Sequence, residues 1–128
     1  MDTLTKLLIV EDDRELVEVY RKVFQKEYDI YVSYDGEEGL IKAANVLPEI
    51  IVLDVDMPKL NGFEVLKAIR ANIDPHALVV IVSNLGEEEN IKKGMELGAD
   101  DYLVKANYDP VGVLERVKQI HKEKKVHQ

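Results

Sequence analysis

The stretch 50–58, IIVLDVDMP, places four apolar residues directly before a carboxylate. The apolar run is continuous rather than alternating, and three of its four residues are β-branched. This pattern is typical of a strand that is buried on both faces of a parallel sheet. Asp54 follows where such a strand leaves the core, and an unpaired charge there is costly. The stretch therefore predicts a buried strand with an acidic residue at its carboxyl end.

Four similar apolar runs lie on either side of this stretch, at residues 6–10, 30–32, 78–82 and 102–104. The segments between and after them have apolar residues at helical spacing, at 16–24, 40–47, 63–69, 91–95 and 113–120. Strict alternation of strand and helix implies right-handed crossovers. The sequence thus predicts an α/β fold, a doubly wound five-stranded parallel sheet of the (βα)5 kind.

Local sequence signals predict where three helices begin or end. Asp13 is expected at the start of the first helix, and Asp35 with Glu38 three residues later has the spacing of a capping box. Gly98 follows the fourth helical segment and is expected to end it.

Length and composition predict one domain. The chain has 128 residues, which suffices for one sizeable core. We expect the domain to cover residues 1–121 and residues 122–128 to form a polar C-terminal tail that frays. The absence of cysteine excludes disulfides and thiolate chemistry and favours a cytoplasmic location.

The net charge of -8 argues against direct nucleic acid contact by this domain, because phosphates would repel it. No apolar run approaches the roughly 20 residues that span a bilayer, so we expect no membrane contact.

Polar residues follow four of the five apolar runs, at the edge where open α/β sheets carry their functional crevice. They are Glu11 and Asp12 after the first run, Asp54 and Asp56 after the third, Ser83 after the fourth and Lys105 after the fifth. The second run brings little beyond Ser33, as expected for an edge strand.

This set has the composition of a phosphoryl site. Clustered carboxylates repel one another unless their pKa values rise or a cation joins them. Ligands that are all oxygen favour a hard ion such as Mg2+, for which Mn2+ could substitute. A screened carboxylate can then attack a phosphoryl group, as in aspartyl phosphates. Lys105 would supply positive charge and Ser83 a hydroxyl donor.

Each of these residues has a plainer interpretation when it is taken alone. Residues 11–13 suit a helix start, Asp56 and Ser83 suit turns, and Lys105 suits the surface. Together, however, four strand ends supply one coherent site, which favours the functional interpretation.

Five stretches carry the motifs of one family: 8–13 (LIVEDD), 51–58 (IVLDVDMP), 61–62 (NG), 81–83 (IVS) and 98–105 (GADDYLVK). Over essentially its whole length the chain resembles a response-regulator receiver domain of two-component systems. The resemblance implies a flavodoxin-like sheet with strand order 2-1-3-4-5. It also implies a signalling switch that catalyses its own phosphorylation and dephosphorylation rather than a conventional enzyme.

The resemblance implies a role for each site residue. Glu11 and Asp12 match the acidic pair that holds Mg2+, Asp54 matches the phosphoacceptor and a metal ligand, and Asp56 would offer its backbone carbonyl to the metal. Ser83 and Lys105 match the residues that contact the phosphoryl group. Tyr102 matches an aromatic switch that turns inward when Ser83 is drawn to the phosphate.

The resemblance implies two kinds of partner. The phosphodonor would be a sensor histidine kinase or phosphotransfer protein, or a small acyl phosphate. A downstream protein or output domain would bind the face formed by the fourth helix, the fifth strand and the fifth helix.

The chain departs from the family pattern at two positions. Ala106 replaces the usual proline after the lysine, and a cis bond there without proline would cost about 3 kcal/mol. Asn84 replaces a small residue after Ser83 and is expected to crowd or hydrogen-bond the pocket.

Three other functions are compatible with part of the pattern. Asp54 and Asp56 fit the D-x-D of a haloacid-dehalogenase-type phosphatase, although Met57 and Pro58 do not continue that motif. A flavodoxin-like FMN carrier would need a phosphate loop after the first strand, where residues 11–13 have the wrong charge. An interaction module that works without phosphorylation would have no need of the charge cluster.

Overall fold

The computed structural model describes residues 3–126 and contains one five-stranded parallel sheet. The strands are β1 (Thr5–Val10), β2 (Tyr28–Ser33), β3 (Ile50–Leu53), β4 (Leu78–Ser83) and β5 (Asp101–Val104). They are ordered β2-β1-β3-β4-β5, and each neighbouring pair is parallel. The predicted fold class, the 2-1-3-4-5 order and the edge position of the second strand are confirmed.

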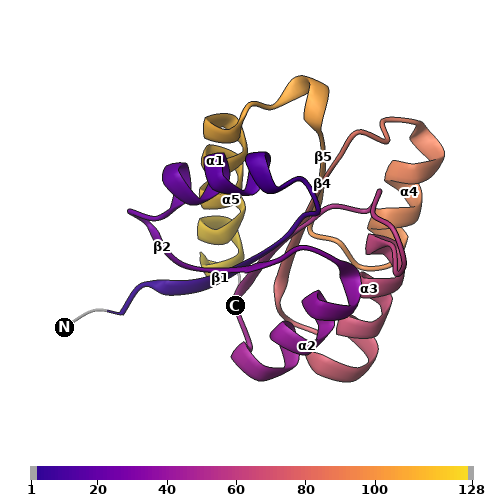
Figure 1. The fold of residues 1–128 in the computed structure, drawn as a ribbon, viewed down its shortest axis with the longest axis horizontal. Helices are drawn as coiled ribbons and strands as arrows, with labels where there is room; N and C mark the ends of the chain where they lie inside the picture. The colour runs from indigo at the N-terminus through magenta and orange to yellow at the C-terminus, as the bar shows by residue number, and fades with distance from the viewer. Residues whose placement is uncertain (1–2, 127–128) are drawn as a thin grey trace.

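Five helices cover the two faces of the sheet (Figure 1). One face carries α1 (Arg14–Phe24) and α5 (Pro110–Val126), and the other carries α2 (Gly36–Val46), α3 (Gly62–Ala68) and α4 (Glu88–Glu96). Among the helices of residues 3–126, none has the length and apolar character required to cross a membrane.

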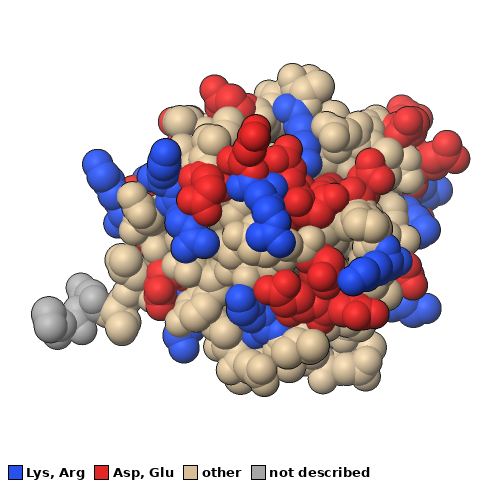
Figure 2. Space-filling view, viewed as in Figure 1, with Lys and Arg blue, Asp and Glu red and all other residues tan. Residues whose placement is uncertain are grey.

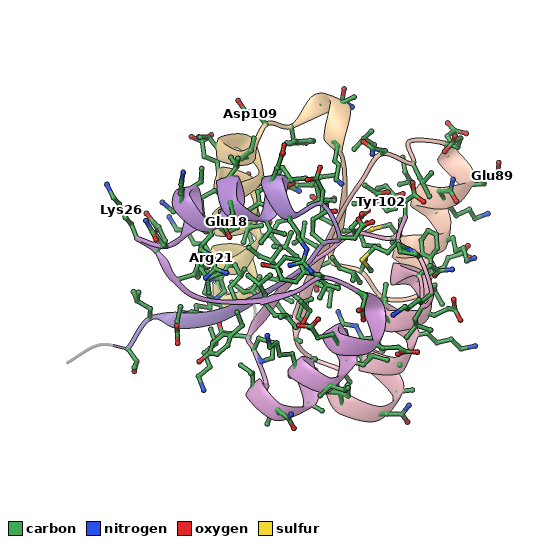
Figure 3. All side chains as sticks on the ribbon, in the orientation of Figure 1. Glu18, Arg21, Lys26, Glu89, Tyr102 and Asp109 are labelled. Carbon is green, nitrogen blue, oxygen red and sulfur yellow. The ribbon has the colours of Figure 1, made fainter. Side chains whose placement is uncertain are left out.

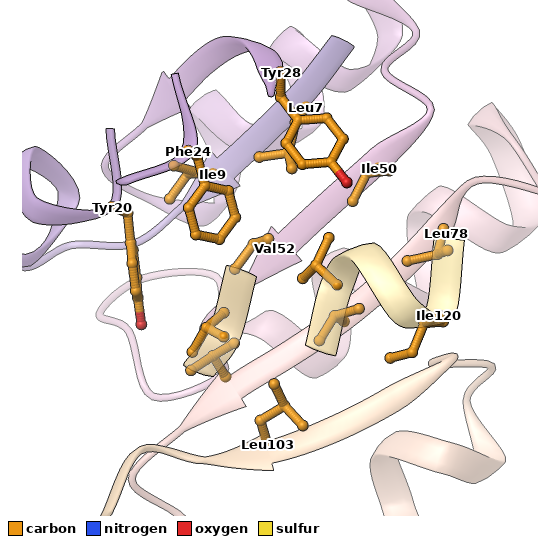
Figure 4. Packing of buried hydrophobic residues seen from close by; sticks show 14 of the residues in the cluster. Leu7, Ile9, Tyr20, Phe24, Tyr28, Ile50, Val52, Leu78, Leu103 and Ile120 are labelled. Atoms are coloured by element: carbon orange, nitrogen blue, oxygen red, sulfur yellow. The ribbon is translucent and has the colours of Figure 1, made fainter. Parts of the chain in front are cut away.

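The alternation of side chains along each strand divides the core into two halves. Leu7 and Ile9 face α1 and α5, where the rings of Phe24 and Tyr28 pack at a tilt of 44° with their centroids 6.3 Å apart (Figure 4). Leu8 and Val10 point to the opposite face, where they pack with the helices α2, α3 and α4. Because the central strands are covered on both sides, their sequences are continuously apolar, as the stretch 50–53 predicted.

The predicted helix signals are found in the structure. The Asp13 carboxylate accepts a hydrogen bond from the Leu16 N–H at 3.1 Å, and the Asp35 carboxylate accepts one from the Glu38 N–H at 2.8 Å. Gly98 has φ +104° just beyond α4, a backbone conformation that a glycine adopts without strain.

Two regions differ from the simple helical pattern. Helix α3 continues into a π-helical turn, η1 (Ile69–Ile73), which local spacing did not predict. Helix α5 extends to Val126, so residues 122–126 of the predicted tail are helical. The Lys124 ammonium donates to the His76 carbonyl at 2.6 Å and holds this extension against the body of the domain. Residues 127–128 lie outside the described residues.

Candidate functional site

Four parallel strands end together at one edge of the sheet. Val10 pairs with Leu53, Leu53 pairs with Ile81, and Ser83 pairs with Val104, so the residues that follow these strands share one edge. Figure 2 shows acidic side chains gathered over the region where β1 ends in Figure 1, with basic side chains on either side. The convergence predicted from the strand ends is therefore present.

Three carboxylates form the centre of the site. One oxygen each from Glu11, Asp12 and Asp54 lies within 4.8 Å of the others. Glu11 and Asp54 are only 3% and 4% exposed, whereas Asp12 is exposed. Backbone bonds continue the sheet into the site, since the Glu11 N–H donates to the Ser33 carbonyl at 3.0 Å and the Asp54 N–H to the Val10 carbonyl at 2.9 Å.

A hard divalent cation fits this donor set. All three ligands are carboxylate oxygens, and the exposed Asp12 leaves one side open for water and phosphate oxygens, as Mg2+ requires. The carboxylate cluster is consistent with the predicted magnesium site.

Lys105 lies against two of these carboxylates. Its Nζ is 2.7 Å from Glu11 Oε1 and 3.7 Å from Asp54 Oδ2. Its side chain is 17% exposed. The buried carboxylates attract the ammonium inward, where it offsets part of their charge.

The local environment raises the pKa values of Glu11, Asp54 and Lys105. Burial, and then the charge of Asp54, raises the pKa of Glu11 from 4.5 to about 7, against the opposing effect of Lys105. Burial also raises the pKa of Asp54, while Lys105 and the Asp56 N–H oppose it. Although burial disfavours the charged lysine, the hydrogen bond to Glu11 and the charge of Asp54 raise the pKa of Lys105.

Asp56 lies at the margin of the cluster. Its side chain is exposed, and its backbone N–H donates to Asp54 Oδ1 at 3.2 Å. The carboxylates that come together are thus Glu11, Asp12 and Asp54, and the expected metal contact through the Asp56 carbonyl stays a prediction.

Ser83 and Tyr102 meet at the backbone of Leu85. The buried Ser83 Oγ accepts a hydrogen bond from the Leu85 N–H at 3.1 Å. The Tyr102 hydroxyl donates to the Leu85 carbonyl at 2.5 Å. The Tyr102 ring is buried on the α4 side of the sheet, where Figure 3 labels it, and a Cβ at Gly94 would lie 2.9 Å from it. In this structure the tyrosine is therefore turned inward.

Ala106 and Asn84, the two departures from the family pattern, need no unusual backbone geometry and no buried contact. The peptide bonds of residues 3–126 are all trans, so the Lys105–Ala106 bond is trans, and a short 3-10 turn, η2 (Lys105–Asn107), follows β5. Asn84 is exposed.

Sequence reasoning missed the structural role of two positions. A Cβ at Gly62 would lie 2.3 Å from the Asp54 carbonyl oxygen, so only glycine permits this approach of α3 to the site. Its signal was present in the Asn61-Gly62 motif. The link through Leu85 uses backbone atoms and therefore has no signature in residue type.

A doubly wound sheet with an acidic cluster, a buried aspartate and a lysine at its carboxyl edge defines the class of phosphorylation switches rather than conventional enzymes. The family model for the response regulator receiver domain matches residues 7–118. The chain belongs to this family of two-component signalling domains. Membership separates it from the phosphatase and flavin-carrier alternatives.

Several known proteins are similar to the chain. The alkaline phosphatase synthesis transcriptional regulatory protein PhoP of Bacillus subtilis is 39% identical over 116 residues, which are 90% of this chain and 48% of PhoP. The chain spans about half the length of the curated relatives it matches.

Two solved structures similar to this chain contain BeF3. The BeF3 activated receiver domain of DrrB from Thermotoga maritima has TM-score 0.84 and 28% identity, covering 94% of this chain and 99% of that one. The CheX-CheY-BeF3-Mg+2 complex from Borrelia burgdorferi has TM-score 0.85 and 33% identity, covering 91% of this chain and 89% of that one.

Proposed function

We propose that Asp54 accepts a phosphoryl group from the phosphohistidine of a sensor kinase or phosphotransfer protein, or from a small acyl phosphate. A carboxylate oxygen of Asp54 forms a bond to phosphorus as the bond to the histidine nitrogen or acyl oxygen breaks, and the leaving group keeps that electron pair. The observation that carries the proposal is the position of Asp54, buried at the end of a central strand between carboxylates and a lysine.

Each neighbour has a proposed part in this transfer. Glu11, Asp12 and Asp54, with the Asp56 carbonyl, would hold Mg2+, or Mn2+ in its place. The ion would screen the negative charge between the aspartate and the incoming phosphoryl group. Lys105, now on Glu11, would move its ammonium toward a phosphoryl oxygen, and Ser83 would donate its hydroxyl to another.

The response is proposed to run through Ser83 and Tyr102. Donating to the phosphoryl group would draw the Ser83 hydroxyl toward Asp54 and away from the Leu85 N–H, whose hydrogen bond its Oγ accepts. Such a charge-assisted bond to the phosphoryl group is worth about 1.5–3 kcal/mol, enough to shift the relative populations of two packings by about one to two orders of magnitude. The inward packing of Tyr102 against Gly94 would then be favoured over an outward one.

The partners and setting follow from the same proposal. The face of α4, β5 and α5 would meet a downstream protein or an output domain, and PhoP, which is about twice as long, is described as a transcriptional regulator. The charge of -8 favours a protein partner over nucleic acid for this domain. We propose a cytoplasmic location for the receiver domain.

The decisive experiment is intact mass after incubation with an acyl phosphate and Mg2+. Wild type is expected to gain one phosphoryl group and Asp54→Asn none. Asp29→Asn is the matched control, because it neutralises an exposed aspartate on β2 outside the carboxylate cluster and should gain the group as wild type does. Equal gain by Asp54→Asn would contradict the assignment. A chain that works without phosphorylation would gain nothing in any variant.

The response is tested separately with Ser83→Ala. This variant should still take up a phosphoryl group at Asp54 but show a reduced NMR change around Tyr102 on addition of beryllofluoride and Mg2+. A full wild-type change in Ser83→Ala would show that the response does not run through Ser83.

A further inference from the structure

The side chain of Arg70 joins three segments at the end of the sheet opposite the acidic site. Its Nε and Nη2 donate to the Gly98 carbonyl at 3.0 and 2.8 Å, and its Nη1 donates to the Ala77 and Asp74 carbonyls at 2.7 and 3.3 Å. Nη2 also bonds Asp100 Oδ2 at 3.2 Å. All five N–H groups of the guanidinium thus have an acceptor. The side chain is 17% exposed.

These bonds hold the turn between α4 and β5 against η1 and the start of β4. Asp100 takes part from the other side, because its Oδ2 accepts from the Val79 N–H at 2.8 Å. Its backbone N–H donates to the Val79 carbonyl, also at 2.8 Å. Gly98 reaches this geometry through its positive φ. One arginine therefore secures the carboxyl end of α4.

The remainder of α4 makes few contacts that fix its position. Gly94 is its one buried residue, and the helix lies close to Tyr102 through that glycine. Ile91 packs at the margin of the core, and Lys93 Nζ lies 4.7 Å from the centroid of the Phe63 ring.

The amino end of α4 has no side-chain cap on its backbone. The Glu87 carboxylate, at the N-cap, accepts a hydrogen bond from the Asn90 side chain at 2.9 Å but from no backbone N–H of the first turn. The preceding loop is attached through Leu85, whose backbone bonds Ser83 and Tyr102. The position of the amino end of α4 thus depends on the two residues of the proposed response.

We propose that Arg70 is the positioning residue of the output response, the fixed point about which α4 moves. This inference rests on the proposed function. A change at Ser83 and Tyr102 reaches the loop at Leu85, so the amino end of α4 moves. The carboxyl end stays in place because Arg70 holds Gly98. Without that restraint, the same change would displace or loosen the whole helix instead of reorienting it.

Arg70→Lys is the variant that isolates this role. Lysine keeps the positive charge near Asp100 but cannot reach the carbonyls of three segments with one compact ammonium. Arg116→Lys is the matched control, since Arg116 bonds the neighbouring Asp101 at 2.7 Å and otherwise the side chain of Gln119. The two substitutions are identical and affect adjacent aspartates.

Hydrogen exchange without any phosphoryl group provides the first measurement. The amides of Gly98, Ala99 and Asp100 are hydrogen-bonded, and their exchange should become about tenfold faster or more in Arg70→Lys. Arg116→Lys should leave them unchanged. Unchanged exchange in Arg70→Lys would overturn the inference, whether or not the proposed function holds.

NMR spectra with beryllofluoride and Mg2+ provide the second measurement, which a merely stabilising role would not change. In wild type the changes around α4 should concentrate at residues 84–90, in the preceding loop and the first turn of the helix. In Arg70→Lys they should spread to residues 94–100, while phosphoryl uptake at Asp54, measured by mass, stays as in wild type. An unchanged distribution would overturn the inference. Absence of uptake in wild type would instead refute the proposed function.

Asp100→Asn keeps the inference testable if Arg70→Lys does not fold. It removes the charged acceptor of one of the five bonds and leaves the carbonyl acceptors in place. Faster exchange of the Gly98 and Ala99 amides, by a smaller factor, is expected. Wild-type exchange at both amides would contradict the role of this network.

Discussion

At the carboxyl end of the sheet, Glu11 and Asp54 share the ammonium of Lys105. At the amino end, the carboxylate of Asp100 has both Arg70 and Lys124 beside it. At the first end two buried carboxylates thus share one cation, whereas at the second end one carboxylate has two cations beside it.

This difference shows which end is built for chemistry. A buried carboxylate whose charge is not fully balanced by nearby cations destabilises the fold. Burial then raises its pKa, as it does for Glu11 and Asp54. The excess negative charge favours the binding of a cation. It also leaves a carboxylate that can act as a nucleophile. The amino end, where acceptors and donors are matched, contributes rigidity instead.

Breaking the amino end should produce the largest loss of stability. Arg70→Met removes the cation nearest Asp100 and leaves the Gly98 and Ala77 carbonyls without their donor. Removing one partner of a largely buried pair costs about 3 kcal/mol. Urea unfolding should show this loss, whereas phosphoryl uptake at Asp54 under native conditions should persist. A loss below about 1 kcal/mol would contradict the contrast between the two ends.

Neutralising a carboxylate at the carboxyl end should instead increase the free energy of unfolding. Asp54→Asn keeps the shape of the side chain and an oxygen for the Asp56 N–H, but removes a buried charge that repels Glu11. The metal-free protein should gain about 1–2 kcal/mol in free energy of unfolding. Asp100→Asn, the same change at the other end, should lose stability. Urea unfolding in the presence of a chelator measures both, and losses in both variants would refute the contrast.

The charge of Glu11 should make metal-free stability depend on pH. Its pKa is about 7 in the fold and 4.5 without the perturbation, so the folded protein retains a proton that the unfolded chain releases. Stability therefore falls as pH rises from 4.5 to about 7 and then levels off, by about 1 kcal/mol between pH 6 and 7.

The Glu11→Gln variant tests this origin of the pH dependence. It should flatten the unfolding profile across that window, as followed by urea unfolding at a series of pH values. Magnesium affinity in wild type should rise across the same window, because the ligand must lose its proton. A stability that rose with pH, or a Glu11→Gln profile as steep as wild type, would count against the assignment.

The smallest effect should come from an exposed ion pair outside both networks. Lys118 Nζ lies 3.1 Å from Glu27 Oε1, with the side chains 47% and 41% exposed. Because water screens such a pair, Lys118→Met should change the free energy of unfolding by less than about 0.5 kcal/mol. This variant also controls for Arg70→Met. A loss near that of Arg70→Met would mean that burial does not distinguish the two ion pairs.

Much of the fold was predictable from local patterns. The apolar runs at 50–53 and 78–82 closely match β3 and β4, because strands covered on both faces are apolar throughout. The run at 30–32 marked only the middle of β2, which begins at Tyr28. That strand lies at the edge, where the exposed Asp29 interrupts the apolar run.

The sequence predicted which residues form the site, but not how their side chains contact one another. Strand ends predicted that Glu11, Asp12 and Asp54 would come together, and they do. The close approach of Lys105 to Glu11 was not predicted, because a lysine stem has many rotamers and its burial depends on neighbours from other strands.

The sequence by itself determined the alternation of strands and helices, the burial of the central strands and the chemical character of the carboxyl edge. These properties follow from the periodicity of apolar residues and from the residue at which each strand ends. Only the tertiary structure decided which residues these side chains form hydrogen bonds with. Arg70 bonds Gly98, 28 positions away, and Ser83 and Tyr102 meet through the backbone of Leu85. Periodicity specifies which face a side chain occupies, whereas the orientation and distance of a hydrogen bond depend on how separate elements pack in three dimensions.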